Sequence, residues 1–140
     1  PFAGGETILE GLEATLLPRI IAPNKAKAGG HENFERFTGK ELLKGTSMGL
    51  SPLGEAYANF GVEGGILFMF FFGLFFNLFL AQVFNFSYRY PTLILWIPLM
   101  FLYVVRAESD FVVVMNYLIK SSVIVWLFYW GFRKFLGIQL

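Results

Sequence analysis

Two long apolar runs dominate the second half of the chain. The first extends over residues 64–84 without a charged residue, and the second extends over 111–132 with Lys120 as its single charge. About 20 apolar residues suffice for an α-helix to cross a hydrocarbon core about 30 Å thick. Side chains this rich in phenylalanine would aggregate if they were exposed to water. Each run therefore predicts a transmembrane helix.

A third apolar segment, residues 92–105, is shorter and contains Pro98. Tyr90 and Tyr103 flank it, and tyrosine is enriched at membrane interfaces. We expect a kinked third crossing here, because a short span can be accommodated by a thinner bilayer; a re-entrant segment is the alternative. The fold class predicted is an all-α integral membrane protein with about three transmembrane helices, at about 64–84, 92–105 and 111–132.

The first part of the chain is polar, so we divide the sequence into a loop region, 1–60, and a transmembrane region, 61–140. Within 6–21 the apolar residues recur at helical spacing, with glutamates on the other side. This pattern predicts a short amphipathic helix that ends at Pro18 and lies on the membrane surface, or that covers the protein's own core. Residues 22–50 have a loop composition rich in Gly, Lys and Asn.

Small or polar side chains recur every four residues along the first predicted span. Such stripes allow a second helix to approach closely. We expect the stripe to face protein and the phenylalanines to face lipid or a lipid substrate. Its members are Gly61, Gly65, Met69, Gly73, Asn77 and Ala81.

Lys120 lies about midway along the last predicted span, where a charge is costly. Asn116 is one turn before it and Ser121 follows it. We expect a polar face there, with a counterpart on a helix outside this sequence as the first explanation and a substrate contact as the second.

The residue composition adds several exclusions to this picture. The mean hydropathy is +0.59 and the net charge is +1, with most charges in residues 1–63. The chain has no cysteine and one histidine, which excludes disulfides and thiolate or polyhistidine metal sites. No cofactor or nucleic-acid partner is expected. Because the chain starts at Pro1 inside a polar segment, we expect it to be the C-terminal part of a larger multi-spanning protein.

Short basic loops indicate the orientation in the membrane. Arg89 has no acid in its loop, and Arg133 and Lys134 follow the last span. Since Lys and Arg in short loops mark the cytoplasmic side, we expect both regions to be cytoplasmic. The N-terminal segment and residues 106–110 are then extracytoplasmic, and the C-terminus is cytoplasmic.

Two motifs resemble a known family. The run from Leu17 to Lys25, LPRIIAPNK, and the run from Thr46 to Gly61, TSMGLSPLGEAYANFG, are followed by a glycine-rich entry into a membrane helix. Together they resemble the C-terminal part of bacterial O-antigen and exopolysaccharide polymerases of the Wzy type. The resemblance implies a bacterial inner-membrane enzyme that transfers a glycan from polyprenyl diphosphate to the sugar hydroxyl of another lipid-linked repeat unit, outside the cytoplasm.

That reaction needs cations at the departing diphosphate and a base at the attacking hydroxyl. Guanidinium groups suit the first task because they make forked hydrogen bonds to phosphate. Several candidates also have ordinary structural explanations: a carboxylate at a helix N-terminus, a tyrosine anchor at the interface, and a solvated histidine in a loop. The catalytic candidates are Glu55, Arg106, Glu108 and Asp110, and the substrate-binding candidates are Arg19, Lys25, His31, Arg36, Tyr57 and Asn59.

Two other functions fit the same sequence. A ligase that moves finished glycan to another acceptor would share the diphosphate-binding arginines. A non-catalytic membrane subunit would use the small-residue stripe to pack inside a larger complex. The partners expected in all cases are the lipid bilayer and further membrane helices, from the missing N-terminal part or from other subunits.

Overall fold

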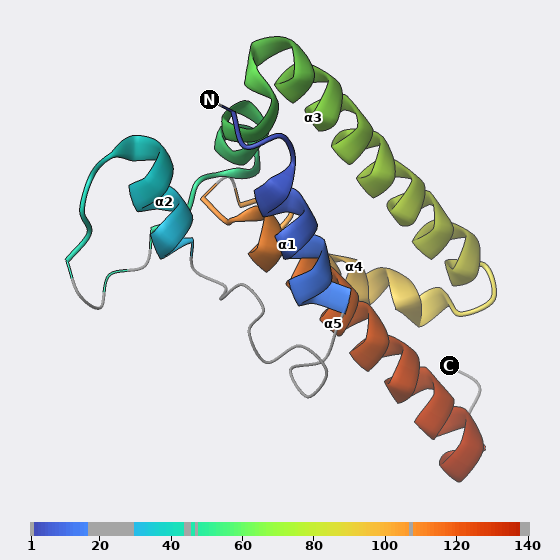
Figure 1. Cartoon of the computed structure of the whole chain (residues 1–140). Coiled ribbons are helices and arrows are strands. Elements are labelled where there is room, and N and C mark those ends of the chain that lie inside the picture. The colour runs from blue at the N-terminus through green and yellow to red at the C-terminus, as the bar shows by residue number, and fades with distance from the viewer. Residues whose placement is uncertain (1, 17–29, 44–45, 47, 107, 138–140) are drawn as a thin grey trace.

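The computed structural model describes residues 2–16, 30–43, 46, 48–106 and 108–137, and their regular structure is entirely helical (Figure 1). Two helices are long and apolar enough to cross a membrane, Pro52–Ser87 and Phe111–Phe135. The elements in chain order are α1 (Glu6–Leu16), α2 (His31–Thr38), α3 (Pro52–Ser87), the 3₁₀ helix η1 (Pro91–Trp96), α4 (Ile97–Met100), α5 (Phe111–Gly131) and the π-helical turn η2 (Phe132–Leu136).

The first long helix, α3, begins before the apolar run and breaks at Gly61. The Ser51 hydroxyl caps it by accepting a hydrogen bond from the Gly54 N–H at 3.2 Å, and Pro52 occupies the first turn. Gly61 has φ 71° and ψ −163°, a conformation essentially restricted to glycine. The break therefore separates a polar entry turn from the apolar arm of the helix.

The N-terminal segment is hydrogen-bonded to α3 at this break. The carbonyls of Ala58 and Asn59 accept hydrogen bonds from the N–H groups of Ala3 and Gly4, at 3.0 and 2.9 Å. The break interrupts the helical hydrogen bonds to these two carbonyls. N–H groups of the N-terminal segment bond to them instead. α1 then starts directly beside the entry turn of α3 (Figure 1).

Helix α1 confirms the amphipathic helix for residues 6–16; residues 17–21 lie outside the described part of the chain. Its buried face includes Ile8 and Gly11, and Ile8 packs with Phe111 and Met115 at the start of α5. A Cβ added at Gly11 would lie 3.0 Å from the Phe111 and Val112 side chains, so the two helices are in close contact. α1 thus covers the protein's own core, which was one of the two alternatives.

Within the described chain the small-residue stripe packs against protein only at its start, and the expectation that the phenylalanines face away from protein is wrong for three of them. Gly61 and Gly65 are buried, but Gly73, Asn77 and Ala81 are exposed. Three phenylalanines, each directly before a member of the stripe in the sequence, face the protein. Their rings are long enough to reach α1 and α5. These are Phe68, Phe72 and Phe76, which pack on Ile8, Phe111 and Met115.

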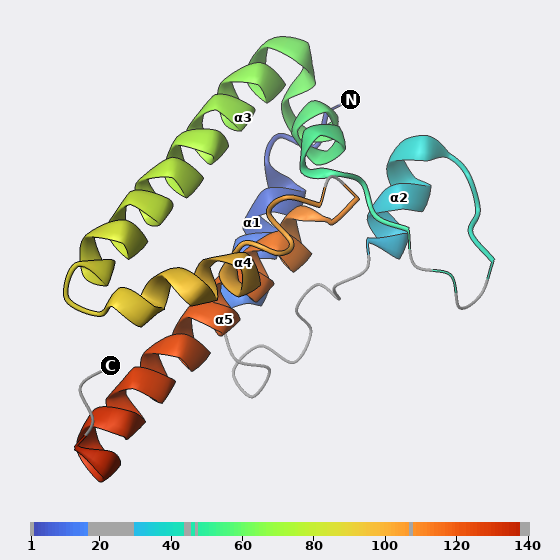
Figure 2. The same ribbon diagram turned by 180° about the vertical axis from the view of Figure 1, so that it is seen from behind.

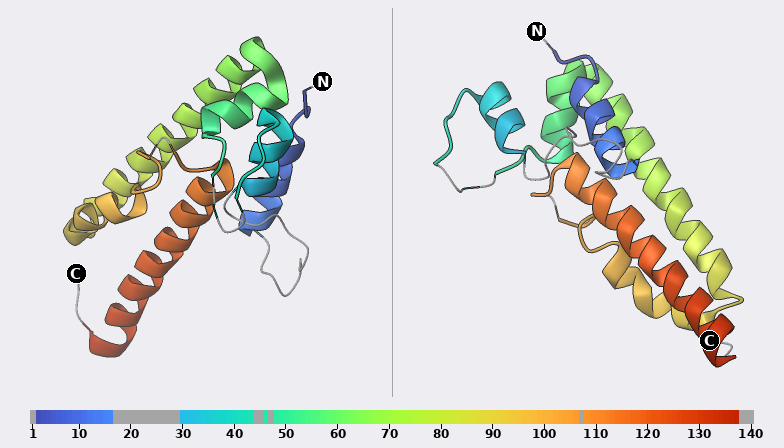
Figure 3. Two further views of the ribbon diagram at one scale, coloured as in Figure 1. Left: turned by 90° about the vertical axis from the view of Figure 1, so that its left-hand side faces the viewer. Right: turned by 60° about the horizontal axis from the view of Figure 1, so that its bottom comes forward.

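The segment expected as a third span, residues 92–105, is not one continuous helix. It consists of η1, α4 and turns, because Pro91 and Pro98 each remove a backbone donor. It nevertheless runs back along α5. At its start the Thr92 hydroxyl is 2.6 Å from the Tyr129 hydroxyl, and near its end the ring centroids of Tyr103 and Tyr117 are 4.5 Å apart. Figures 2 and 3 show this return beside α5.

Candidate functional site

The starts of α3 and α5 meet at one end of the molecule through a buried carboxylate. Glu55 is 3% exposed, and its Oε1 accepts a hydrogen bond from the Phe111 N–H at 3.2 Å. Asp110, the residue before α5, is 5% exposed and lies close enough to Glu55 to interact with it electrostatically. Two carboxyl groups that are far apart in the sequence therefore share a buried environment.

Asn59 extends this buried cluster toward α1. Its Oδ1 accepts a hydrogen bond from the Gly5 N–H at 3.1 Å, and its Nδ2 donates to Thr7 Oγ1 at 2.7 Å and to the Glu55 carbonyl at 2.8 Å. Both Asn59 and Thr7 are buried. The Asn59 amide therefore joins α3 to the N-terminal segment and α1 within this structure.

Glycine backbones pack against the Asp110 carboxylate. A Cβ added at Gly49 would lie 1.1 Å from Asp110 Oδ1, and one added at Gly30 would lie 2.7 Å from the same atom. Gly30 also has φ +59°, which favours glycine. The loop before α3 and the start of α2 can approach Asp110 only because these two residues lack side chains.

The environment of Glu55 favours its protonated form. Burial raises the pKa of Glu55 from 4.5 to about 7; the Phe111 N–H lowers it, and the neighbouring Asp110 carboxylate raises it. Its Oε2 is buried and has no hydrogen-bond partner among the described residues. Glu55 lies before the Gly61 break, outside the apolar run 64–84. It can gain or lose a proton near neutral pH at this end of the molecule.

Charged side chains on the adjacent loop are exposed. Arg106 and Glu108 are both exposed, and the Arg106 guanidinium lies 5.4 Å from the centroid of the Tyr103 ring. Within the described chain, Arg106 forms no ion pair with Glu108 or Asp110. Arg106 and Glu108 are accessible to a ligand at this end.

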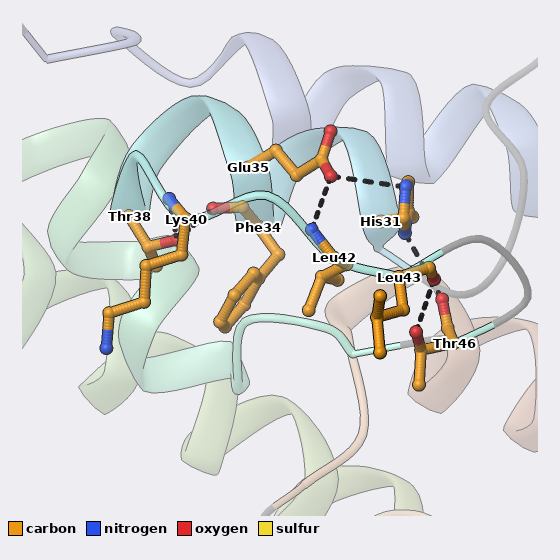
Figure 4. Close-up of polar contacts among 8 residues, drawn as sticks. All are labelled: His31, Phe34, Glu35, Thr38, Lys40, Leu42, Leu43 and Thr46. Atoms are coloured by element: carbon orange, nitrogen blue, oxygen red, sulfur yellow. Dashed lines mark hydrogen bonds and ion pairs between the residues drawn. The ribbon is translucent and has the colours of Figure 1, made fainter.

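Helix α2 is a further element at this end, and the sequence analysis missed it. Glycines in the left-handed conformation flank it, Gly30 before and Gly39 after. Figure 4 shows its polar contacts: His31 Nε2 lies 3.4 Å from Glu35 Oε1, and the same Oε1 accepts a hydrogen bond from the Leu42 N–H at 2.7 Å. Glu35 therefore organises this segment, although sequence reasoning assigned it no role.

The remaining candidates are dispersed. The Arg36 guanidinium pairs with Glu6 at 3.0 Å on the surface, and His31 Nδ1 lies 3.2 Å from the Thr46 carbonyl oxygen. Tyr57 is exposed, with its ring edge-on to that of Phe2. Arg19 and Lys25 lie outside the described residues. In the described part of the chain, no group of three or more His, Asp or Glu residues could hold a metal ion.

The structure thus brings Glu55, Asn59 and Asp110 together inside the molecule. It leaves four other candidates on the surface at the end of the molecule where α3 and α5 begin: Arg106, Glu108, His31 and Arg36. The two glycines against Asp110 were missed, and the only available signal was their occurrence as Gly29-Gly30 and as Gly49 in a polar loop.

Comparison with known protein families gives a match over most of the chain. The family model described as O-antigen polysaccharide polymerase Wzy matches residues 24–136, which is most of the chain. Searches of curated proteins and of solved structures gave no match. The matched region includes the buried acids, the exposed loop at 106–110 and both long helices.

Proposed function

Because the chain belongs to the Wzy family of O-antigen polysaccharide polymerases, we propose that the joined starts of α3 and α5 form part of its site for lipid-linked repeat units. Proteins of this family polymerise O-antigen repeat units, and the apolar helices α3 and α5 agree with a place in the inner membrane. The proposed location is extracytoplasmic, with the loop at residues 88–90 and the C-terminus on the cytoplasmic side.

The proposed reaction is transfer of the growing glycan between two lipid-linked molecules. The hydroxyl oxygen of the incoming repeat unit attacks the anomeric carbon of the growing chain. The bond between that carbon and the diphosphate oxygen breaks, polyprenyl diphosphate leaves with the electron pair, and the hydroxyl proton passes to a base. The protein must therefore supply positive charge to the diphosphate and a proton acceptor to the hydroxyl.

The exposed loop after α4 supplies candidates for both tasks. We assign the diphosphate contact to Arg106, whose guanidinium is exposed and forms no ion pair with any described acid. Glu108 is exposed two residues later and is the candidate base nearest to it in the sequence. Arg36 and His31 on α2 are additional candidates for substrate contact, and so are Arg19, Lys25 and Tyr57.

The buried acids receive a positioning role in this proposal. Glu55 and Asp110 are almost fully buried, so they do not reach a sugar hydroxyl in the structure described. Glu55 instead binds the first N–H of α5, and this fixes where the 106–110 loop enters the helix. The observation that carries the proposal is this junction, which in the sequence directly follows a loop with an exposed arginine and an exposed acid.

A paired arginine test separates this role from general stability. Arg106→Ala should leave single repeat units and remove the long O-antigen ladder, because the leaving diphosphate loses its cation; a drop of about 100-fold or more in polymer is expected. The control is Arg89→Ala, since Arg89 is also exposed and lies over a tyrosine ring, at 6.0 Å from Tyr90, but at the opposite end. Normal ladders with Arg106→Ala, in protein of unchanged abundance, would contradict the proposal.

A further inference from the structure

Helix α5 carries a charge that no other described residue neutralises. Lys120 is exposed near the middle of Phe111–Gly131. Within the described residues it makes no ion pair. A lysine in the hydrocarbon region normally faces the protein interior and pairs with another polar group. Its position therefore requires an explanation beyond the fold described above.

Lys120 lies on the side of α5 that faces away from the other elements. Leu118 is 1% exposed and Val125 is 3% exposed, and Val125 packs with α3 and α4. At 3.6 residues per turn, Lys120 is rotated by about 200° from Leu118. The charged side chain thus points to the face opposite the one already covered.

The residues on this face have the spacing of a helix-packing surface. Spacings of three and four residues are the repeat by which one helix packs against another. Asn116 Oδ1 is buried and has no hydrogen-bond partner among the described residues, whereas Val123 and Leu127 are 49% and 48% exposed. We call this surface the α5 seam; it consists of Val113, Asn116, Lys120, Val123 and Leu127.

Every Asp and Glu of this chain is among the described residues, and none forms an ion pair with Lys120. The span of α5 contains no acid, and neither does the apolar run of α3. Asp110 is ten residues earlier, about 15 Å along the helix axis at 1.5 Å per residue. On α1, Gly11 faces α5, so Glu13 is rotated by about 200° away from it and is exposed.

A second copy of the chain cannot supply the missing charge either. In a second copy with the same membrane orientation, Asp110 is again about 15 Å from the level of Lys120. A symmetric contact through the α5 seam would also place Lys120 against its own counterpart, and like charges repel. The complementary group must come from a helix with a different sequence.

We propose that the α5 seam is the docking face for a transmembrane helix of different sequence that carries an Asp or Glu at the depth of Lys120. The carboxylate pairs with the ammonium group, and the apolar seam residues pack around this ion pair. This proposal concerns assembly in the membrane and does not depend on which residues contact the glycan.

The test is photo-crosslinking in the full-length protein in its native membrane. A benzophenone amino acid replaces Leu127 on the seam, or Phe70 on the exposed face of α3 as the control. We expect the Leu127 adduct to map by mass spectrometry to a transmembrane peptide with an Asp or Glu, and the Phe70 position not to give that peptide. Adducts at Leu127 with lipid only, or with a helix that has no acid, would overturn the proposal.

The charge itself is tested by variants of Lys120. Lys120→Arg should keep the adduct, whereas Lys120→Glu should reduce its yield about tenfold or more. Exchanging the mapped acid for Lys in the Lys120→Glu background should restore the yield. Because Lys120→Glu could also impair insertion, Lys120→Leu provides a variant that inserts more readily. An unchanged adduct yield with Lys120→Leu would show that the charge does not direct docking.

Discussion

At the scale of single residues, the most informative side chain is Glu55. The sequence suggested two roles for it, a helix-terminal carboxylate or a catalytic base. The structure gives it a definite contact at the start of another helix, the Phe111 N–H, in a buried position. That contact joins residues 56 positions apart, and it could not be read from the sequence because it depends on how α1, α3 and α5 meet.

The pH dependence of stability should report on Glu55. Since its folded pKa is raised from 4.5 to about 7, the folded chain retains a proton that the unfolded chain has lost. Stability should therefore be full below the lower pKa and should fall as the pH rises through the folded value, by about 3 kcal/mol in total. Glu55→Gln should remove most of that loss, measured as the difference in detergent-solubilised Tm between about pH 5 and pH 8.

The matched control for this prediction is Glu63→Gln, because Glu63 is on the same helix but exposed. Glu63→Gln should leave the pH dependence of Tm the same as in the unmodified protein. An equal pH dependence in Glu55→Gln and in the unmodified protein would contradict the assignment of the proton to Glu55.

Asp110 leads to a second prediction at this scale. A methyl group at Gly49 would occupy the position of the Asp110 carboxylate, at 1.1 Å from Oδ1. Gly49→Ala should therefore destabilise the protein by about 1–3 kcal/mol, the usual range for overpacking. Thermal unfolding in detergent measures it. Gly54→Ala is the control, since a Cβ there meets its nearest neighbour at an ordinary 3.5 Å.

At the scale of elements, hydrophobic runs predicted the two long helices well, because a membrane-spanning helix needs only length and apolar composition. The sequence did not predict α2, whose eight residues lie between glycines in a polar segment. The described chain covers the small-residue stripe at Gly61 and Gly65 but not at Gly73, Asn77 and Ala81. Sequence spacing shows which residues share a face, but not which face the neighbouring helices cover.

The break in α3 can be tested at this scale. Gly61→Ala should destabilise the chain by about 1–3 kcal/mol, because the φ of 71° is strained for alanine and a Cβ would lie 3.0 Å from the Phe2 ring. Residues 3–5 should also lose their attachment to Ala58 and Asn59. Hydrogen exchange at the Ala3 and Gly4 amides measures the release.

Gly73→Ala provides the comparison for Gly61→Ala. Gly73 lies in the same helix with open space around its Cα, so alanine there should be neutral or slightly stabilising. Similar exchange rates at the N-terminal amides in both variants would mean that the break does not hold this segment.

At the scale of the whole molecule, both long helices of the described chain start at one end, where the Phe111 N–H donates a hydrogen bond to the Glu55 carboxylate. The return segment 91–110 makes this possible, although it contains no helix of spanning length. The sequence correctly indicated the class and the family. It overestimated the regularity of the third segment, where prolines interrupt the backbone.

The proposed orientation can be measured directly by cysteine labelling, and these 140 residues contribute no cysteine of their own. A single cysteine at Glu108 should react with a membrane-impermeant thiol reagent in intact cells. A single cysteine at Tyr88, which is 88% exposed, should react only after the inner membrane is permeabilised. Labelling of both positions from outside would contradict the proposed topology.

The irregular stretch between Phe101 and Arg106 has a consequence for the surroundings of the protein. The N–H groups of Leu102, Val104 and Val105 are hydrogen-bonded within these turns, but turns satisfy fewer carbonyls than a continuous helix does, and acyl chains offer those carbonyls no hydrogen bonds. Wherever this stretch lies at hydrocarbon depth, it must therefore border other polypeptide or a hydrated space. This flank of α5 is accordingly not one that lipid alone can cover.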